Sequence, residues 1–97
     1  MTILWMPLAE QDLDSAYEYV RQENKSAAKQ LMARIFSAAG MLLRHPLAGR
    51  EGRVSGTREL VVARTPYVIA YRLRGSEIQI LAVLHGAQQW PSSFTTN

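Results

Sequence analysis

Arginine side chains offer the most chemistry in this sequence, and they are concentrated in its second half. Residues 41–97 contain seven basic residues, all of them arginine, and three acidic residues, whereas residues 1–40 contain four basic and five acidic residues. A guanidinium group is planar and can bind a carboxylate or a phosphate through two parallel hydrogen bonds. The arginines therefore suit an acidic protein partner or a nucleic acid, although a solvated basic face without any partner would have the same composition.

A catalytic role is one interpretation of these side chains. Arg72 and Arg74 could hold a scissile phosphate and His85 could transfer a proton near neutral pH, which would make an RNase that needs no metal ion. The competing interpretation puts the arginines on the solvent face of strands, and we favour it because no Lys–Tyr or Glu–His pair accompanies them. His85 follows an apolar run and precedes Gly86, so a structural role at a strand end fits equally well.

Other kinds of chemical site find no support in the sequence. The chain has no cysteine, which excludes a disulfide, a thiolate metal site and a cysteine nucleophile. Its two histidines lie outside any HExxH pattern, and no glycine-rich phosphate loop is present. We therefore expect neither a metal ion nor a cofactor. No apolar run approaches the roughly 18 residues of a membrane span and no secretory signal begins the chain, so we expect a cytoplasmic protein.

The hydrophobic pattern of the front half predicts a short strand followed by two helices. Residues 3–6 are an apolar run suited to a strand. Apolar residues then recur at spacings of three and four, first from Leu8 to Val20 and again from Ala27 to Leu43, as on one face of a helix. Asn24 interrupts the pattern and can cap the second helix. Two amphipathic helices with so short a connection predict an antiparallel helical hairpin.

The pattern changes to strands in the back half. Residues 60–63, 67–73 and 78–84 are apolar or alternating runs, separated by short turn sequences. The predicted fold class is therefore α+β, with the element order β-α-α-β-β-β and the helical hairpin packed on an antiparallel sheet. We expect one domain over residues 1–97, with a flexible tail at about residues 92–97.

Several segments together resemble the ParE/RelE superfamily of bacterial toxins. Each segment alone is weakly specific, but their order and spacing are characteristic, and the resemblance covers nearly the whole chain. The front half agrees through EQDLDSAYEYV after the first strand and SAAKQL in the second helix. The segments of the back half are HPLAGR (45–50), GTREL (56–60), PYVIAYR (66–72) and IQILAVLHGAQQWP (78–91).

The resemblance implies a toxin of a type II toxin–antitoxin pair, held inactive in a hetero-oligomer by its antitoxin and associated with plasmid stabilisation. In this superfamily the C-terminal segment of the antitoxin wraps the toxin, with a helix on the helical hairpin and an extended piece along the sheet. An acidic segment that folds onto an arginine-rich, partly apolar surface combines electrostatic attraction with burial of apolar area.

The two branches of the superfamily differ in their target, and the sequence favours the ParE branch. RelE-like members cut messenger RNA on the ribosome with basic residues on the sheet, but Val68 stands here in place of the phosphate-holding arginine, and Gln88 in place of another. The lysine pair and the C-terminal tyrosine of that branch are also missing. A buried valine cannot stabilise developing phosphate charge. ParE-like members instead poison DNA gyrase by binding it, although many of them carry an arginine near Gln88.

The leading hypothesis is a gyrase poison that has no catalytic residues and is neutralised by a ParD-like antitoxin. The alternative is a ribosome-dependent mRNA endoribonuclease that uses Arg72, Arg74 and His85, and a third possibility is a non-toxic relative that only binds its antitoxin. We expect no direct sequence-specific binding of nucleic acid. We expect the contacts with the target in the segments 50–58 and 85–90. The full set of expected partner-binding residues is Arg50, Arg53, Arg58, Arg64, Arg72, His85, Gln88 and Trp90.

Trp90 also has a structural interpretation, which we favour. A tryptophan at the end of a sheet in so small a domain is more often a lid on the core than a platform for stacking bases. The aromatic and arginine residues of this chain are thus a weak signal for nucleic-acid binding, since no recognised binding motif accompanies them.

Overall fold

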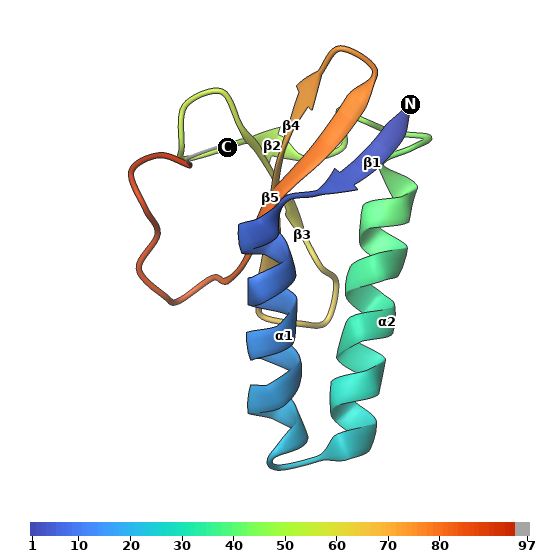
Figure 1. The fold of residues 1–97 in the computed structure, drawn as a ribbon, viewed down its shortest axis with the longest axis vertical. Helices are drawn as coiled ribbons and strands as arrows, with labels where there is room; N and C mark the ends of the chain where they lie inside the picture. The colour runs from blue at the N-terminus through green and yellow to red at the C-terminus, as the bar shows by residue number, and fades with distance from the viewer. Residues whose placement is uncertain (95–97) are drawn as a thin grey trace.

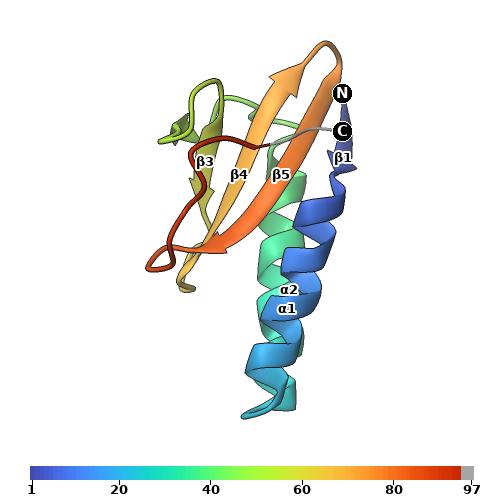
Figure 2. The same ribbon diagram turned by 60° about the vertical axis from the view of Figure 1, so that its left-hand side comes forward.

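A computed structural model describes residues 1–94 and shows two layers, a helical hairpin and a five-stranded sheet (Figure 1). The strands follow the order β1-β5-β4-β3-β2 across the sheet, and the helices cover one of its faces (Figure 2). The α+β prediction is confirmed, including the hairpin on the sheet. In chain order the elements are β1 (Thr2–Trp5), α1 (Pro7–Arg21), α2 (Lys25–Met41), β2 (Arg50–Glu51), β3 (Arg58–Val61), β4 (Tyr67–Arg74) and β5 (Glu77–His85).

Local sequence signals account for the ends of the helices. Pro7 begins α1, where its missing N–H group needs no partner within the helix. Asn24 caps α2 as predicted, because its side-chain oxygen accepts a hydrogen bond from the backbone N–H of Ala27 at 2.9 Å. Neither helix is long and apolar enough to cross a membrane, among the residues described.

The sheet is mixed, which corrects the expectation of a purely antiparallel sheet. β1 pairs with β5 in parallel, with Ile3 beside Ile78 and Trp5 beside Ile80, whereas the other three pairings are antiparallel. The helical hairpin explains this direction, since it carries the chain away from the end of β1 and back before the meander begins. The short β2 is a further addition, because its two residues fall in a segment that was expected to be a loop.

The core lies between the hairpin and the inner face of the sheet. Ile35 and Leu42 near the sheet and Ile69, Ile78 and Ile80 within it are fully buried. The helical stripes were predicted correctly in their centres and wrongly at two ends. Leu8 and Leu43 remain 43% and 48% exposed, since the buried position at the start of α1 is Ala9 and since α2 has already ended at Met41 before Leu43.

Tyr71 joins the sheet to the chain that follows α2. Its hydroxyl group accepts a hydrogen bond from the N–H of Gly49 at 2.9 Å and donates one to the carbonyl of Pro46 at 2.8 Å, and the side chain is fully buried. A Cβ atom on Gly49 would lie 2.6 Å from the ring of Tyr71 and 2.9 Å from the carbonyl oxygen of Glu59. Position 49 therefore requires glycine because the chain passes too close for any side chain.

The C-terminal segment packs against the outer face of the sheet, away from the helices. Trp90 and Phe94 contact a small cluster formed by Ala70, Ala82 and Leu84. The proposed flexible tail therefore includes Phe94, a residue that makes core contacts, while its last part, residues 95–97, lies outside the described residues.

Replacing Ile35 by alanine is expected to lower the free energy of unfolding by about 2–4 kcal/mol, since it removes a fully buried side chain from the interface between α2 and the sheet. Chemical denaturation monitored by tryptophan fluorescence measures the change. Lys29→Ala is the control, because Lys29 is exposed on the same helix. A cost for Ile35→Ala no larger than that of the control would contradict this account of the core.

Candidate partner-binding site

A buried carboxylate organises the arginines at the outer face of the sheet. Glu59 of β3 has a side chain only 2% exposed, and two arginines bind it from the adjoining segment. Arg53 donates to one oxygen through its backbone N–H at 2.7 Å and its Nε at 3.1 Å, and its Nη2 reaches the other oxygen at 3.2 Å. Arg50 adds a bond of 3.2 Å from Nη2. Sequence analysis did not single out Glu59, which lies within the GTREL segment.

The ionisation of Glu59 follows from these bonds. Burial by itself would raise the pKa of the Glu59 carboxyl, but the hydrogen bonds from Arg53 and Arg50 and the charge of Arg53 outweigh burial and lower the pKa below its usual value. The carboxylate is therefore charged at neutral pH. Since it accepts from both arginines, these two side chains already have an internal anion as partner.

The two segments expected to contact the target lie together in the structure. The guanidinium carbon of Arg53 lies 3.6 Å above the centre of the Trp90 ring, which is a cation–π contact. Figure 2 shows the C-terminal segment crossing the outer face of the sheet, where Trp90 covers Ala70 and Ala82. The small alanine side chains leave room for the indole ring, so Trp90 is a lid on the sheet. Its buried Nε1–H has no hydrogen-bond partner among the described residues.

Arg58 and Arg72 also have partners within the chain. Arg58 donates from Nη1 to the carbonyl of Gly49 at 2.8 Å and so holds the connection before β2. Arg72 donates from Nε to the side-chain oxygen of Gln79 at 2.7 Å. Desolvation, followed by the positive charge of Arg74, lowers the pKa of Arg72 from its usual value. Both arginines thus contribute to the arrangement of the sheet and its loops.

His85 and Gln88 form a turn at the end of β5. The backbone N–H of His85 donates to the side-chain oxygen of Gln88 at 2.7 Å, and Nδ1 of His85 accepts from the N–H of Ala87 at 3.0 Å. The imidazole ring meets the ring of Tyr67 edge to face, with centres 5.5 Å apart. Burial, and to a lesser extent Tyr19, raises the pKa of Tyr67. These contacts agree with a structural role for His85 at a strand end.

The three residues of the RNase hypothesis do not meet. Tyr71 and Leu73 face the helices, so Arg72 between them faces the outer side of the sheet, whereas His85 lies on the same side as Tyr67, which packs in the helix-facing core. Arg72 pairs with Gln79 in the strand register, six positions along β5 from His85. At the usual rise of a strand this is roughly 20 Å. Arg74 pairs with Glu77 and is farther still.

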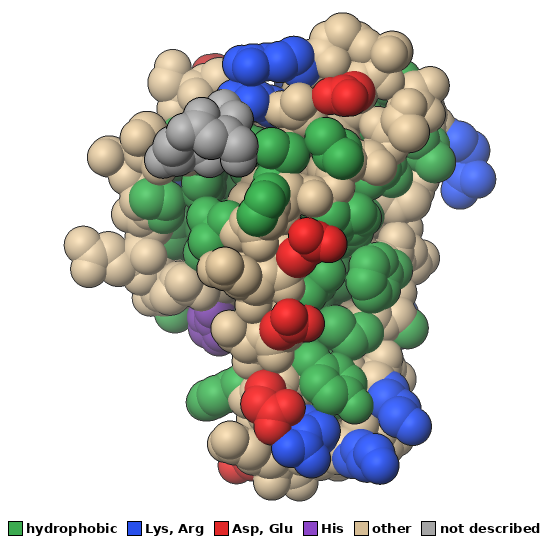
Figure 3. Space-filling model, in the orientation of Figure 1, with side chains coloured by type: hydrophobic (Ala, Val, Ile, Leu, Met, Phe, Trp, Pro, Cys, Tyr) green, Lys and Arg blue, Asp and Glu red, His purple; other side chains and the backbone are tan. Residues whose placement is uncertain are grey.

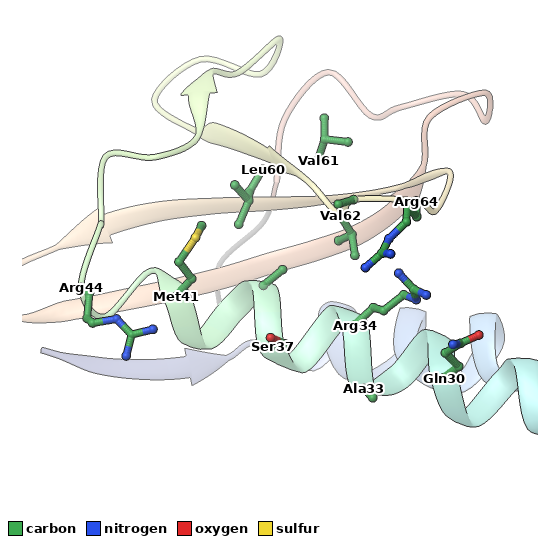
Figure 4. Close-up of a pocket in the computed structure, with 12 residues that line it drawn as sticks. Gln30, Ala33, Arg34, Ser37, Met41, Arg44, Leu60, Val61, Val62 and Arg64 are labelled. Carbon is green, nitrogen blue, oxygen red and sulfur yellow. The ribbon is translucent and has the colours of Figure 1, made fainter.

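Arg64 borders a hollow between α2 and β3 that sequence analysis did not foresee (Figure 4). The hollow has a volume of about 600 Å³, and its wall combines apolar side chains such as Met41 and Leu60 with three arginines. Two of these, Arg34 and Arg44, come from α2 and the turn after it. Nothing in the sequence indicated a role for Arg34, because its proximity to Arg64 depends on how α2 packs against the sheet.

A second apolar surface lies on the helical hairpin, on the face shown in Figure 3. Phe36 of α2 is 50% exposed, and its ring meets the ring of Trp5 edge to face, with centres 5.2 Å apart. Leu4 and Leu8 are also partly exposed.

At the border of α1 and β5, Asp12 accepts a hydrogen bond from the N–H of Val83 at 2.9 Å, a position that β1 is too short to reach. Burial raises the pKa of Asp12, and the bond from Val83 opposes this effect.

Comparison with known proteins gives one consistent family. The model of the family described as "ParE toxin of type II toxin-antitoxin system, parDE" matches residues 3–90. The chain is 42% identical over 89 residues to Y4kP of Sinorhizobium fredii, whose name presents it as a candidate toxin, and the match covers 92% of each chain. It is 33% identical over 86 residues to the protein named Toxin RelE2 of Caulobacter vibrioides, covering 89% of this chain and 96% of that one.

A solved structure gives the same result. A chain of the chromosomal ParDE toxin–antitoxin system from P. aeruginosa superposes with a TM-score of 0.80 at 30% sequence identity. The match covers 88% of this chain and 95% of the other. Similarity therefore extends over both the helical hairpin and the sheet, in sequence as well as in structure.

Replacing Glu59 by glutamine is expected to lower the free energy of unfolding by about 2 kcal/mol at pH 7, because it removes a buried charge that two arginines bind. The loss is limited because the side chains of Arg50 and Arg53 are 62% and 44% exposed, so water screens their charges. Urea denaturation at several pH values measures it, with Glu51→Gln of the neighbouring strand as the control.

The pH dependence of this difference has a defined sign. The pKa of Glu59 is lower in the folded chain than its ordinary value of 4.5, so the stabilisation is complete above that value and is lost as the pH falls through the folded-state pKa. The difference in the free energy of unfolding between wild type and Glu59→Gln should therefore become smaller below about pH 4. A difference that stays constant down to pH 3 would mean that folding does not change the pKa of the Glu59 carboxyl.

Proposed function

The chain belongs to the ParE toxin family of type II toxin–antitoxin systems, and on this premise we propose that it poisons DNA gyrase by binding, with a ParD-like antitoxin as the protein that neutralises it. Gyrase acts on DNA inside the bacterial cell, so the proposal also places the toxin in the cytoplasm. The toxin acts as a ligand of its target and has no hydrolytic step of its own.

The observation that carries this proposal is the separation of the groups that an RNase would need. Arg72 and His85 lie on opposite faces of the sheet and six register positions apart, so they cannot act on the same phosphate. General acid–base catalysis requires the proton donor within hydrogen-bond reach of the reacting group, and stabilisation of phosphate charge requires donors about 3 Å away. Side chains so far apart are suited to binding and not to a shared catalytic step.

The outer face of the sheet gives further support. The position at which the RNase branch carries its phosphate-holding arginine is Val68, which is only 6% exposed. Trp90 and Phe94 cover the neighbouring Ala70 and Ala82, so an RNA strand would have to displace them. Arg53 and Arg50 are engaged by Glu59. This face thus presents aromatic, arginine and amide groups, which suit contact with another protein. We propose that the toxin contacts gyrase through it.

Ribosome-dependent cleavage of messenger RNA is the alternative. The relative named RelE2, at 33% identity, is the observation in its favour. This mechanism would require the segment from Gly86 onward to move and the charged groups of the sheet to rearrange around the message. Under it, Arg72→Ala and His85→Ala would each abolish toxicity while leaving the fold intact.

A paired assay tests the proposed function. We expect the purified toxin to inhibit supercoiling by gyrase and to increase gyrase-dependent DNA cleavage, while ribosome-bound messenger RNA stays intact. Prior addition of the antitoxin should remove this effect. Cleaved message with unimpaired supercoiling would reject the gyrase proposal in favour of the RNase. Normal growth of cells that express the toxin without antitoxin, with neither activity, would identify a non-toxic relative.

A further inference from the structure

The hollow between α2 and β3 has an unusual distribution of charge. Its floor is apolar, formed by residues that include Ala38, Met41, Leu60 and Val62. Arginine supplies all of its charge, and none of the described residues that line it is acidic. By contrast, Arg50, Arg53, Arg58 and Arg72 have carboxylate, carbonyl or amide partners within the chain. The hollow is therefore a place where positive charge gathers beside apolar surface without an internal anion.

Two of the arginines point toward each other. Figure 4 shows the guanidinium groups of Arg34, from α2, and Arg64, from the turn between β3 and β4, converging at one end of the hollow. Both also line a second, smaller hollow beside Tyr67 and His85, so they stand on the ridge between the two. Like charges repel when they converge, and an anion between them would turn this repulsion into two charge-assisted interactions.

The turn that carries Arg64 is held in a conformation that few residues other than glycine adopt. Arg64 has a φ of 64°, in the left-handed region. Hydrogen bonds on both sides maintain it, since the N–H and hydroxyl groups of Thr65 donate to the carbonyl of Val62 at 3.1 and 2.9 Å, and the N–H of Tyr67 donates to the Thr65 hydroxyl at 3.1 Å. The backbone thus directs Arg64 towards α2, and less entropy is lost when a ligand binds.

One edge of the hollow is an unpaired stretch of strand. β2 pairs only with Arg58 and Glu59, so beyond Glu59 the outer edge of β3 has no strand beside it in the described part of the chain. The N–H of Val62 points inward, to the carbonyl of Tyr67. In an antiparallel ladder the direction alternates, so the backbone groups of Val61, the last residue of β3, point outward and can pair with an added strand.

We propose that Arg34 and Arg64 form a clamp that holds one carboxylate of the antitoxin, while the same antitoxin segment lies in an extended form along the outer edge of β3 at Val61. The proposal rests on the toxin–antitoxin assignment and names the contact within that complex. An antitoxin segment fits better than a free anion, because apolar side chains would fill the floor of the hollow and backbone groups would satisfy the strand edge. Alternating apolar and acidic residues are the chemistry that matches both features.

Binding of the antitoxin to variants of the two arginines tests the clamp. Arg34→Gln removes one guanidinium, and Arg64→Asn removes the other with a residue that tolerates a positive φ. Each change is expected to weaken the complex at least about tenfold, as truncation of one member of a buried charge pair does. Lys29→Gln is the matched control, since it removes one positive charge from the same helix outside the hollow, and it should change affinity little. Thermal unfolding of each variant confirms that the fold is kept.

A double-mutant cycle distinguishes a shared carboxylate from two separate contacts. If both arginines hold the same acid, the double variant should lose much less affinity than the product of the two single losses. Strictly multiplicative losses would overturn the clamp, as would single variants that bind as tightly as the Lys29→Gln control. Lower affinity of the wild-type complex at higher salt, with a smaller salt effect in the double variant, is the accompanying expectation.

Hydrogen exchange tests the strand edge. In the complex with the antitoxin, the amide of Val61 should exchange at least about tenfold more slowly than in the free toxin, because it would become hydrogen-bonded to the antitoxin backbone. Unchanged exchange would overturn the extended mode, and protection that grows with toxin concentration alone would assign the edge to a second copy of the chain. The gyrase assay tests the proposed target independently of the clamp. If the toxin fails to inhibit gyrase but the Arg34 and Arg64 variants still bind the antitoxin more weakly, the gyrase proposal is rejected and the clamp is supported.

Discussion

The ion cluster around Glu59 determines the organisation of the outer face of this protein. One carboxylate, almost completely buried, binds the backbone and side chain of Arg53 and the side chain of Arg50, and Arg53 in turn lies over the ring of Trp90. An isolated buried charge would be costly, so the arginines and the carboxylate require each other. Through this chain of contacts the loop before β3, the sheet and the C-terminal segment become one surface.

The cluster also explains why a basic half-chain need not be a nucleic-acid site. Charge counted along the sequence suggests a field available to a phosphate, yet Arg50, Arg53, Arg58 and Arg72 all have partners within the fold. The same guanidinium chemistry that recognises phosphate is satisfied by a carboxylate, a carbonyl and an amide. Arg34 and Arg64 differ, because none of the described residues that line their hollow is acidic. This difference separates the proposed antitoxin contact from the proposed gyrase contact.

Most of the secondary structure was predictable because its signals are local. The apolar spacing of α1 and α2, the cap at Asn24 and the alternation in β4 each depend on residues close together in the chain. The parallel pairing of β1 with β5 was not predictable, since strands of four residues carry no mark of direction and their partners are far away in sequence. For the candidate site, the sequence named the 50–58 and 85–90 segments, whose contact with a target stays a prediction. It did not indicate that Arg53 and Trp90 join these segments, nor the role of Glu59.

The sequence by itself determined the family, the α+β class and the absence of cysteine chemistry, because these depend on residue type, order and spacing. Only the tertiary structure decided which arginines have a partner within residues 1–94, because pairing depends on distances in the fold. Arg34 and Arg64, for example, are brought together by α2 and a turn from separate parts of the chain. It likewise decided that Arg72 and His85 lie apart, since a strand alternates its faces and one bulge or register shift changes which side chains meet.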